Sequence, residues 1–214
     1  MKATNKSYNG ALINFLLIVF QIGFLLCGLG IGLYVLYTII ALLSSDSIFP
    51  VGLPVVFSLD HSGVFNLPGH HEVFNFNMSQ GMGIIGVDHL PKDFVALHSI
   101  ITVLGVTCVL LSLKLTIAIL EAVKQGGFLI IENAIRLRGI ALLSISTFFI
   151  ERLASFASSF YLSDKLHFSG LEFTSINFYS FFNTQSIFYS LFLLVIAEAF
   201  RIGALLKQES DLTI

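Results

Sequence analysis

Charged residues are scarce in this sequence. They make up 11% of the chain, whereas a typical soluble domain has about a quarter of its residues charged. Apolar residues make up 56% of the 214 residues. A soluble core of this size cannot bury so many apolar side chains, so the composition argues against a soluble globular protein.

Several chemical motifs are also missing. The sequence has no nucleophile elbow, no phosphate-binding loop and no helical His-Glu-x-x-His pattern, so we expect no enzyme activity. The net charge of −2 gives no reason to expect direct nucleic-acid binding. Both cysteines, Cys27 and Cys108, fall in apolar stretches, where a thiol behaves as a small apolar group. They do not indicate a disulfide framework.

The sequence does contain several long stretches without charged residues. Residues 7–45, 94–113 and 173–197 contain no Asp, Glu, Lys or Arg. Each is long enough to cross a bilayer, which takes about 20 apolar residues in a helix. Residues 139–162 are equally apolar but include Glu151 and Arg152. We therefore predict an all-α membrane protein, a bundle of four transmembrane helices over residues 10–43, 94–120, 139–162 and 180–201.

The basic residues predict how these spans are oriented. One group comprises Lys2, Lys6, Lys124, Arg136, Arg138, Arg201 and Lys207, and the opposite connections hold only Lys92 and Lys165. Because Lys and Arg collect on the cytoplasmic side, residues 1–9, 121–138 and 202–214 should be cytoplasmic. The loops at 44–93 and 163–179 should then lie outside.

The two outer loops carry strand signals. All four prolines lie in the first loop, together with short β-prone runs at residues 53–57 and 73–76, and the second loop adds residues 171–176. We predict a small β-rich extracytoplasmic cap formed by both loops. The cap also holds Asp60-His61, His70-His71-Glu72 and Asp88-His89, but no spacing fixes a coordination geometry, so we predict no metal and no other cofactor.

Small and polar residues should mark the contacts between helices, because apolar residues do not drive helix association in lipid. Gly28-Leu29-Gly30-Ile31-Gly32 follows Asn14 and Gln21 on the first span and favours close helix packing; a nucleotide loop would need a preceding strand. The polar stripes expected to face the interior are His98, Thr102, Gly105, Ser112 and Thr116; Ser144, Thr147, Glu151, Ser155 and Ser158; and Asn183, Ser186 and Ser190.

Glu151 and Arg152 lie near the middle of their span, where a charged side chain costs about 2.5–3.5 kcal/mol. Depth counted from the span ends predicts an intramembrane polar cluster of Gln21, Thr107, Glu151, Arg152, Tyr189 and Ser190. The functional interpretations of this cluster are a proton or ion relay and a small-ligand site. The structural interpretations are a polar clasp between helices and an outward tilt in which Arg152 snorkels to the interface. Closer to the cytoplasm, Lys114 should pair with Glu198 or with Glu121, and Glu198 can also reach Arg201.

The relay hypothesis can be tested with Glu151→Gln, which removes the titratable carboxyl and keeps the shape of the side chain. If Glu151 belongs to a proton or ion relay, the substitution should abolish the pH dependence of the cellular phenotype, or of proton or ion flux measured in proteoliposomes. A wild-type phenotype with an unchanged pH response would contradict the relay and leave the structural clasp.

The most distinctive sequence motifs lie at the predicted cytoplasmic end. They comprise residues 197–214 (AEAFRIGALLKQESDLTI), Gly127-Phe128, Glu132-Asn133 and Arg136-Leu137-Arg138-Gly139. With these motifs the chain resembles a family of bacterial four-span membrane proteins, domain of unknown function 2975. In the family pattern a Pro usually precedes the Phe, where this chain has Gly127.

The resemblance implies a multi-pass protein of the bacterial inner membrane that is the partner or inhibitor of a small helix-turn-helix DNA-binding regulator. A small transporter or permease-like component that uses Glu151 and Arg152 is the alternative. Gly203 and the polar residues 207–211 should end the fourth helix and leave a short apolar terminus that docks on a partner or frays. The predicted partner surface is Phe128, Glu132, Asn133, Arg136, Arg138, Arg201, Gly203, Asp211, Leu212, Thr213 and Ile214.

Overall fold

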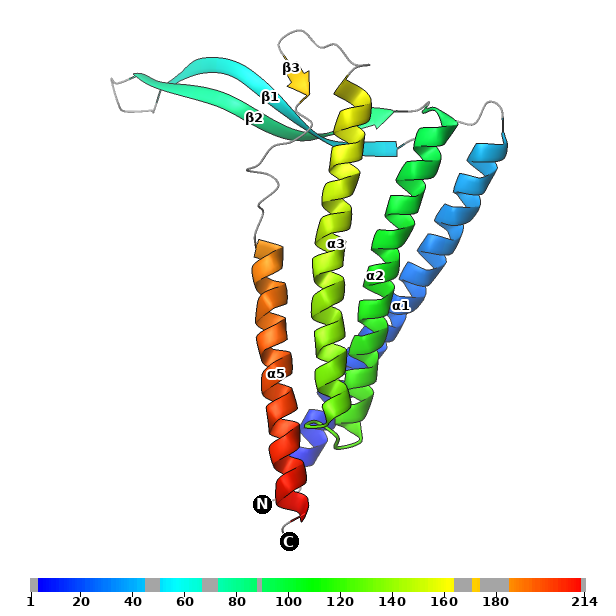
Figure 1. Ribbon diagram of the computed structural model, residues 1–214, viewed down its shortest axis with the longest axis vertical. Helices are drawn as coiled ribbons and strands as arrows, with labels where there is room; N and C mark the ends of the chain where they lie inside the picture. The colour runs from blue at the N-terminus through cyan, green and yellow to red at the C-terminus, as the bar shows by residue number, and fades with distance from the viewer. Residues whose placement is uncertain are drawn as a thin grey trace. The chain divides into compact units, whose positions relative to one another are not determined.

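Four long helices dominate the protein. The computed structural model describes residues 4–44, 51–66, 73–87, 90–163, 171–173 and 185–212. The helices are α1 (Thr4–Leu43), α2 (Lys92–Lys124), α3 (Ile131–Ser163) and α5 (Gln185–Leu212) (Figure 1). Each contains a stretch long and apolar enough to cross a membrane. The predicted four-helix membrane fold is therefore confirmed.

The chain divides into two units. Unit 1 comprises Met1–Ile39, Thr102–Ile150 and Thr184–Ile214, and unit 2 comprises Ile40–Ile101 and Glu151–Asn183. The three segments that the basic residues assign to the cytoplasm all belong to unit 1, whereas both predicted outer loops belong to unit 2. The predicted orientation requires this grouping, because segments on one side of a membrane lie at the same ends of the helices.

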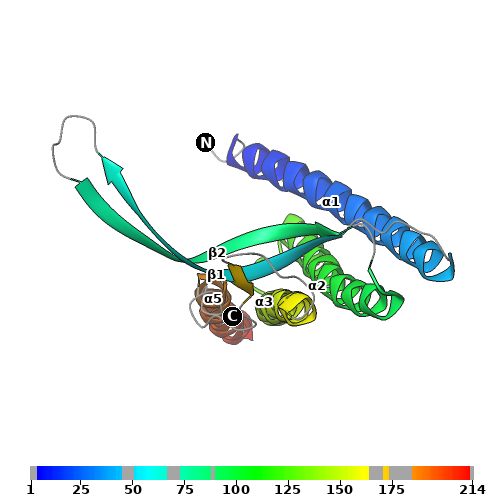
Figure 2. The same cartoon turned by 90° about the horizontal axis from the view of Figure 1, so that it is seen from above.

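Unit 2 contains an antiparallel sheet in the order β2-β1-β3. β1 (Val51–Asn66) pairs with β2 (Val73–Val87) along its whole length, with an irregularity between Ser58 and His61. β3 (Leu171–Phe173) pairs only with residues 57–59 of β1. Figure 2 shows β1 and β2 as a long twisted ribbon with β3 beside β1. The strands are much longer than the predicted runs, and their place as an extracytoplasmic cap stays a prediction.

Helix ends in unit 2 are tied by specific contacts. The Lys92 Nζ donates to the carbonyl of Leu42 at 2.9 Å, which satisfies an unpaired carbonyl at the C-terminal end of α1. The ring of Phe94, in the first turn of α2, stacks on Tyr161 of α3 with centroids 4.1 Å apart. These contacts fix one end of α2 against α1 and α3.

Unit 1 is organised around α3, which contacts both α2 and α5. A Cβ added at Gly139 of α3 would lie 3.0 Å from Leu115 of α2, and Arg138 of α3 pairs with Glu198 of α5. Small side chains buried every seven residues form the contact stripes, as expected where helices approach closely in lipid. They are Ala134 and Ala141 on α3 and Ser190, Ala197 and Ala204 on α5.

The prediction of close packing at Gly28, Gly30 and Gly32 of α1 is wrong for the part of the chain that the structure describes. A Cβ added at any of the three would meet no atom within 4 Å. Gly30 instead lines an open apolar groove of about 310 Å³, between Cys27, Gly30, Ile31 and Tyr34 of α1 and Thr102, Val103 and Val106 of α2. Asn14 and Gln21 are exposed as well.

The polar stripes of the other helices are partly corrected. Ser158 and Ser190 are buried, and all five stripe residues of α2 are half-buried. Ser144, Glu151 and Ser186 are exposed, because the buried stripe of α3 follows Ala134, Ala141 and Phe148 rather than the hydroxyls. Asn183 lies outside the described residues.

Reporter fusions test the predicted orientation. Green fluorescent protein fused after residue 214 should fluoresce, and alkaline phosphatase at the same position should be inactive. A phosphatase fusion that ends within residues 163–170 should be active, because the second outer loop is predicted to leave the cytoplasm. Phosphatase activity after residue 214 would contradict the orientation.

Candidate functional site

The turn between α2 and α3, residues 125–130, is built on a glycine with positive φ. Gly126 has a φ of 85°, a conformation that residues with a side chain rarely adopt. Its N–H donates to the carbonyl of Val123 at 3.0 Å, and the N–H of Gly127 donates to the carbonyl of Ala122 at 2.8 Å. This pair of bonds is a Schellman motif, which ends a helix by satisfying its last carbonyls. Proline at position 127 could not make the second bond, because it has no N–H.

Asn133 closes this turn from the side of α3. Its side chain is fully buried, and its Nδ2 donates to the carbonyls of Gly127 and Phe128 at 2.9 and 3.2 Å. The Arg136 Nη1 donates to the Oδ1 of Asn133 at 2.9 Å and to the carbonyl of Ala118 of α2 at 3.0 Å. We call these bonds the Asn133–Arg136 clasp. The clasp fixes the turn and joins α3 to α2.

The clasp changes the role of Asn133. The sequence motif predicts Asn133 on the partner surface, but a fully buried side chain cannot touch a partner directly. Arg136 is half-buried, and one of its guanidinium nitrogens serves the clasp. The neighbouring Glu132 is exposed. In the sequence, Asn133 follows the glycines of the turn by a few residues. This pattern does not distinguish a buried side chain from an exposed one, so the sequence alone does not identify the clasp.

Two apolar side chains of the turn face α5. The Phe128 ring is 52% exposed and meets the ring of Phe200 edge-on, with centroids 5.0 Å apart. Leu129 lies over Gly203, since a Cβ added at Gly203 would lie 3.3 Å from the Leu129 Cδ2. Gly203 therefore allows the turn to approach α5 closely. The structure leaves half of the Phe128 ring available for contact with another molecule.

The prediction that Gly203 and residues 207–211 end the fourth helix is wrong. α5 continues through Gly203 to Leu212. The Leu129 contact supplies the packing that a glycine in a helix lacks, and Lys207 and Asp211 are four residues apart, a spacing that favours a helix. Residues 205–212 are all exposed, including Asp211 and Leu212. Thr213 and Ile214 lie outside the described residues.

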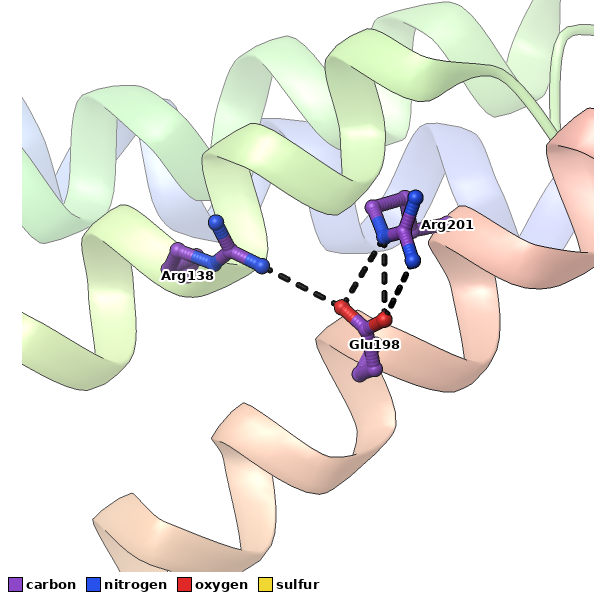
Figure 3. Close-up of polar contacts among 3 residues, drawn as sticks. All are labelled: Arg138, Glu198 and Arg201. Carbon is purple, nitrogen blue, oxygen red and sulfur yellow. Dashed lines mark hydrogen bonds and ion pairs between the residues drawn. The ribbon is translucent and has the colours of Figure 1, made fainter.

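Glu198 joins α3 to α5 through two arginines (Figure 3). The Arg138 Nη2 lies 3.2 Å from one carboxylate oxygen, and the Arg201 Nη2 lies 2.6 Å from the other. The Arg201 Nε donates to both oxygens at 3.0 Å. We call this group the Arg138–Glu198–Arg201 cluster. The predicted Glu198–Arg201 pair is present, whereas Arg138 takes the place predicted for Lys114, since α3 contacts α5 directly.

The residues of the predicted intramembrane cluster belong to both units. Glu151 and Arg152 are in unit 2 and the other four in unit 1, so their convergence stays a prediction. Gln21, Thr107, Glu151 and Tyr189 are exposed and Arg152 is half-buried. The hydroxyls of Thr107 and Ser190 donate to the carbonyls of Val103 and Ser186 of their own helices. Gln185 donates to the Tyr189 hydroxyl at 3.0 Å.

The sequence of the first outer loop has no spacing that fixes a metal geometry, and most of the residues concerned have no described structure. His70, His71, Glu72, Asp88 and His89 lie outside the described residues. Within the ranges that are described, no group of three or more His, Cys, Asp or Glu side chains is placed to hold a metal ion.

A protein-family model described as "Protein of unknown function (DUF2975)" matches residues 79–214, well over half of the chain. The chain belongs to the DUF2975 family. The region shared with DUF2975 includes the turn, the Asn133–Arg136 clasp and the Arg138–Glu198–Arg201 cluster, and it leaves α1 and β1 outside. No curated protein and no solved structure matches the chain.

Replacing Asn133 tests whether the clasp holds the turn. Asn133→Ala removes three hydrogen bonds, including those to the carbonyls of Gly127 and Phe128, a loss of about 1–3 kcal/mol in stability. We expect a lower thermal unfolding temperature in detergent and faster proteolysis within residues 125–130. Glu132→Ala, at the adjacent exposed position, is the matched control and should behave as wild type. Equal unfolding temperatures and cleavage rates for the two variants would contradict the clasp.

Proposed function

We propose that this protein is a regulatory protein of the bacterial inner membrane that holds or inhibits a small helix-turn-helix DNA-binding regulator at its cytoplasmic face. It acts by binding and carries out no catalysis. The observation that carries the proposal is the half-exposed Phe128 on a turn that the Asn133–Arg136 clasp keeps rigid. Rigid aromatic side chains are the commonest anchors of protein interfaces, because little conformational entropy is lost when they bind.

The end of α5 supplies a second element of the proposed interface. Beyond the buried Ala204, residues 205–212 form a helical segment in which every residue is exposed. Leu206 is 61% exposed and Leu212 is 88% exposed, although both follow Arg201, the predicted cytoplasmic end of the span. Exposed leucines on a helix that leaves the membrane favour docking in the groove of a soluble partner. This helical segment extends the docking element beyond the short apolar terminus expected from the sequence.

The class of partner rests on the family. The chain belongs to the DUF2975 family. The resemblance described from the sequence implies that members of this family accompany small helix-turn-helix regulators. A partner that binds DNA would need no nucleic-acid site on the membrane protein itself. The transporter alternative has less support, because the Thr107 and Ser190 hydroxyls bond to their own helices.

Capture of the partner from its native membrane tests the proposal. A tagged full-length chain, crosslinked in cells, should retain a helix-turn-helix regulator. We expect Phe128→Ala, and separately deletion of residues 211–214, to reduce capture about tenfold, the effect of losing one interface anchor. Phe192→Ala is the control, since Phe192 is 63% exposed but lies within the apolar part of α5.

Two results would contradict the proposal. One is that no DNA-binding regulator is captured by the wild-type chain. The other is that Phe128→Ala and the deletion capture as much regulator as Phe192→Ala while all three are present in the membrane at equal levels.

A further inference from the structure

We propose that the Arg138–Glu198–Arg201 cluster binds the phosphate group of an anionic phospholipid in the cytoplasmic leaflet. This assignment goes beyond the proposed partner function, because its ligand is the lipid headgroup. It gives Arg138 and Arg201 a role distinct from that of Phe128.

The cluster lies at the predicted cytoplasmic boundary of the membrane spans, the level at which lipid phosphates would lie. Arg138 directly precedes the apolar stretch of α3, and Glu198 directly follows the charge-free residues 173–197. Contacts within unit 1 bring the predicted span ends to one level, since Arg136 bonds to the carbonyl of Ala118 and Arg138 bonds to Glu198. The predicted boundaries of three spans therefore coincide at this cluster.

The charge of the cluster suits an anion. Two guanidinium groups share one carboxylate, so the cluster keeps a net charge of +1. Arg138 uses only its Nη2 for Glu198, and Arg201 uses its Nε and Nη2. Among the described residues, the Nε and Nη1 of Arg138 and the Nη1 of Arg201 make no hydrogen bond. These planar groups match the geometry of phosphate oxygens.

Glu198 orients the two arginines. In Figure 3 the guanidinium groups reach the carboxylate from two different helices, α3 and α5. The side chains of Arg138, Glu198 and Arg201 are 54%, 43% and 44% exposed, and an ion pair so exposed contributes little to stability by itself. A carboxylate that holds two exposed guanidinium groups close together is better explained as preorganisation for a shared ligand.

Apolar side chains continue from the cluster toward the membrane. Leu142, one turn after Arg138 on the same face of α3, is 52% exposed. Val195, one turn before Glu198 on α5, is 66% exposed. Side chains three or four residues apart share one helix face. The same faces that carry the cluster therefore offer an apolar surface to acyl chains, which a free phosphate ion or an acidic protein would not need.

Lipid selectivity of the full-length protein tests this proposal. The protein is reconstituted in phosphatidylcholine bilayers with spin-labelled phosphatidylglycerol or spin-labelled phosphatidylcholine, and electron paramagnetic resonance gives the protein-associated fraction of each label. We expect wild type to prefer phosphatidylglycerol about fivefold or more, since each basic residue near the surface contributes about that factor. Arg138→Gln combined with Arg201→Gln should remove most of this preference and leave it well below that of the lysine control variant.

The matched control removes two other exposed lysines of unit 1, Lys124→Gln with Lys207→Gln. It should keep most of the preference. Glu198→Gln keeps both guanidinium groups, raises the net charge of the cluster and retains an amide oxygen that accepts hydrogen bonds from the arginines, so the preference should stay or increase. Arg138→Lys with Arg201→Lys keeps the charge but loses the planar fork, and it should lower the preference even if the Gln variant does not fold.

Four outcomes would overturn the proposal. An equal loss in the lysine control would indicate a general basic surface, and loss in Glu198→Gln would indicate a purely structural ion pair. Abolition of the preference by millimolar inorganic phosphate would indicate a soluble anion. An unchanged preference in the arginine variants together with lost capture of the regulator would indicate a protein ligand. Because the partner test depends on Phe128, either proposal can fail without the other.

Discussion

Inside the hydrocarbon core no water is present to bond the backbone, so every N–H and C=O must find its partner within the protein. Four uninterrupted helices satisfy that requirement here. The same constraint reaches the polar side chains. The hydroxyls of Thr107, Ser112, Thr116, Ser158 and Ser190 each donate to the carbonyl four residues earlier. A hydroxyl stripe in this bundle is thus satisfied locally and does not require a polar pathway across the membrane.

Helix ends leave backbone groups unpaired, and several specific contacts among the described residues lie there. Lys92 caps α1, the glycine turn at 126–127 closes α2, and Asn133 fixes that turn. A turn so constrained has few conformations to lose on binding, which is the property that makes Phe128 a suitable anchor. The structural need to end α2 and the proposed binding function are therefore served by one set of residues.

Two surfaces of different chemistry follow one another along α5. The Arg138–Glu198–Arg201 cluster marks the predicted membrane boundary, and the exposed helix of residues 205–212 continues beyond it. The cluster would anchor the bundle to the headgroup layer, and the segment beyond would be held at a fixed distance from the membrane. A soluble regulator bound there would be kept at the membrane surface and away from DNA.

The number of helices and the family could be predicted from the sequence, because long charge-free stretches and short motifs are local properties of the chain. It also placed Phe128 and Arg201 among the candidate residues. Tertiary structure alone decided the rest, because burial depends on neighbours distant in sequence. Asn133 became a buried clasp because the turn folds over it. Gly203 stayed within a helix because Leu129 packs on it, and Glu198 paired with Arg138 because the Arg138 side chain of α3 reaches α5.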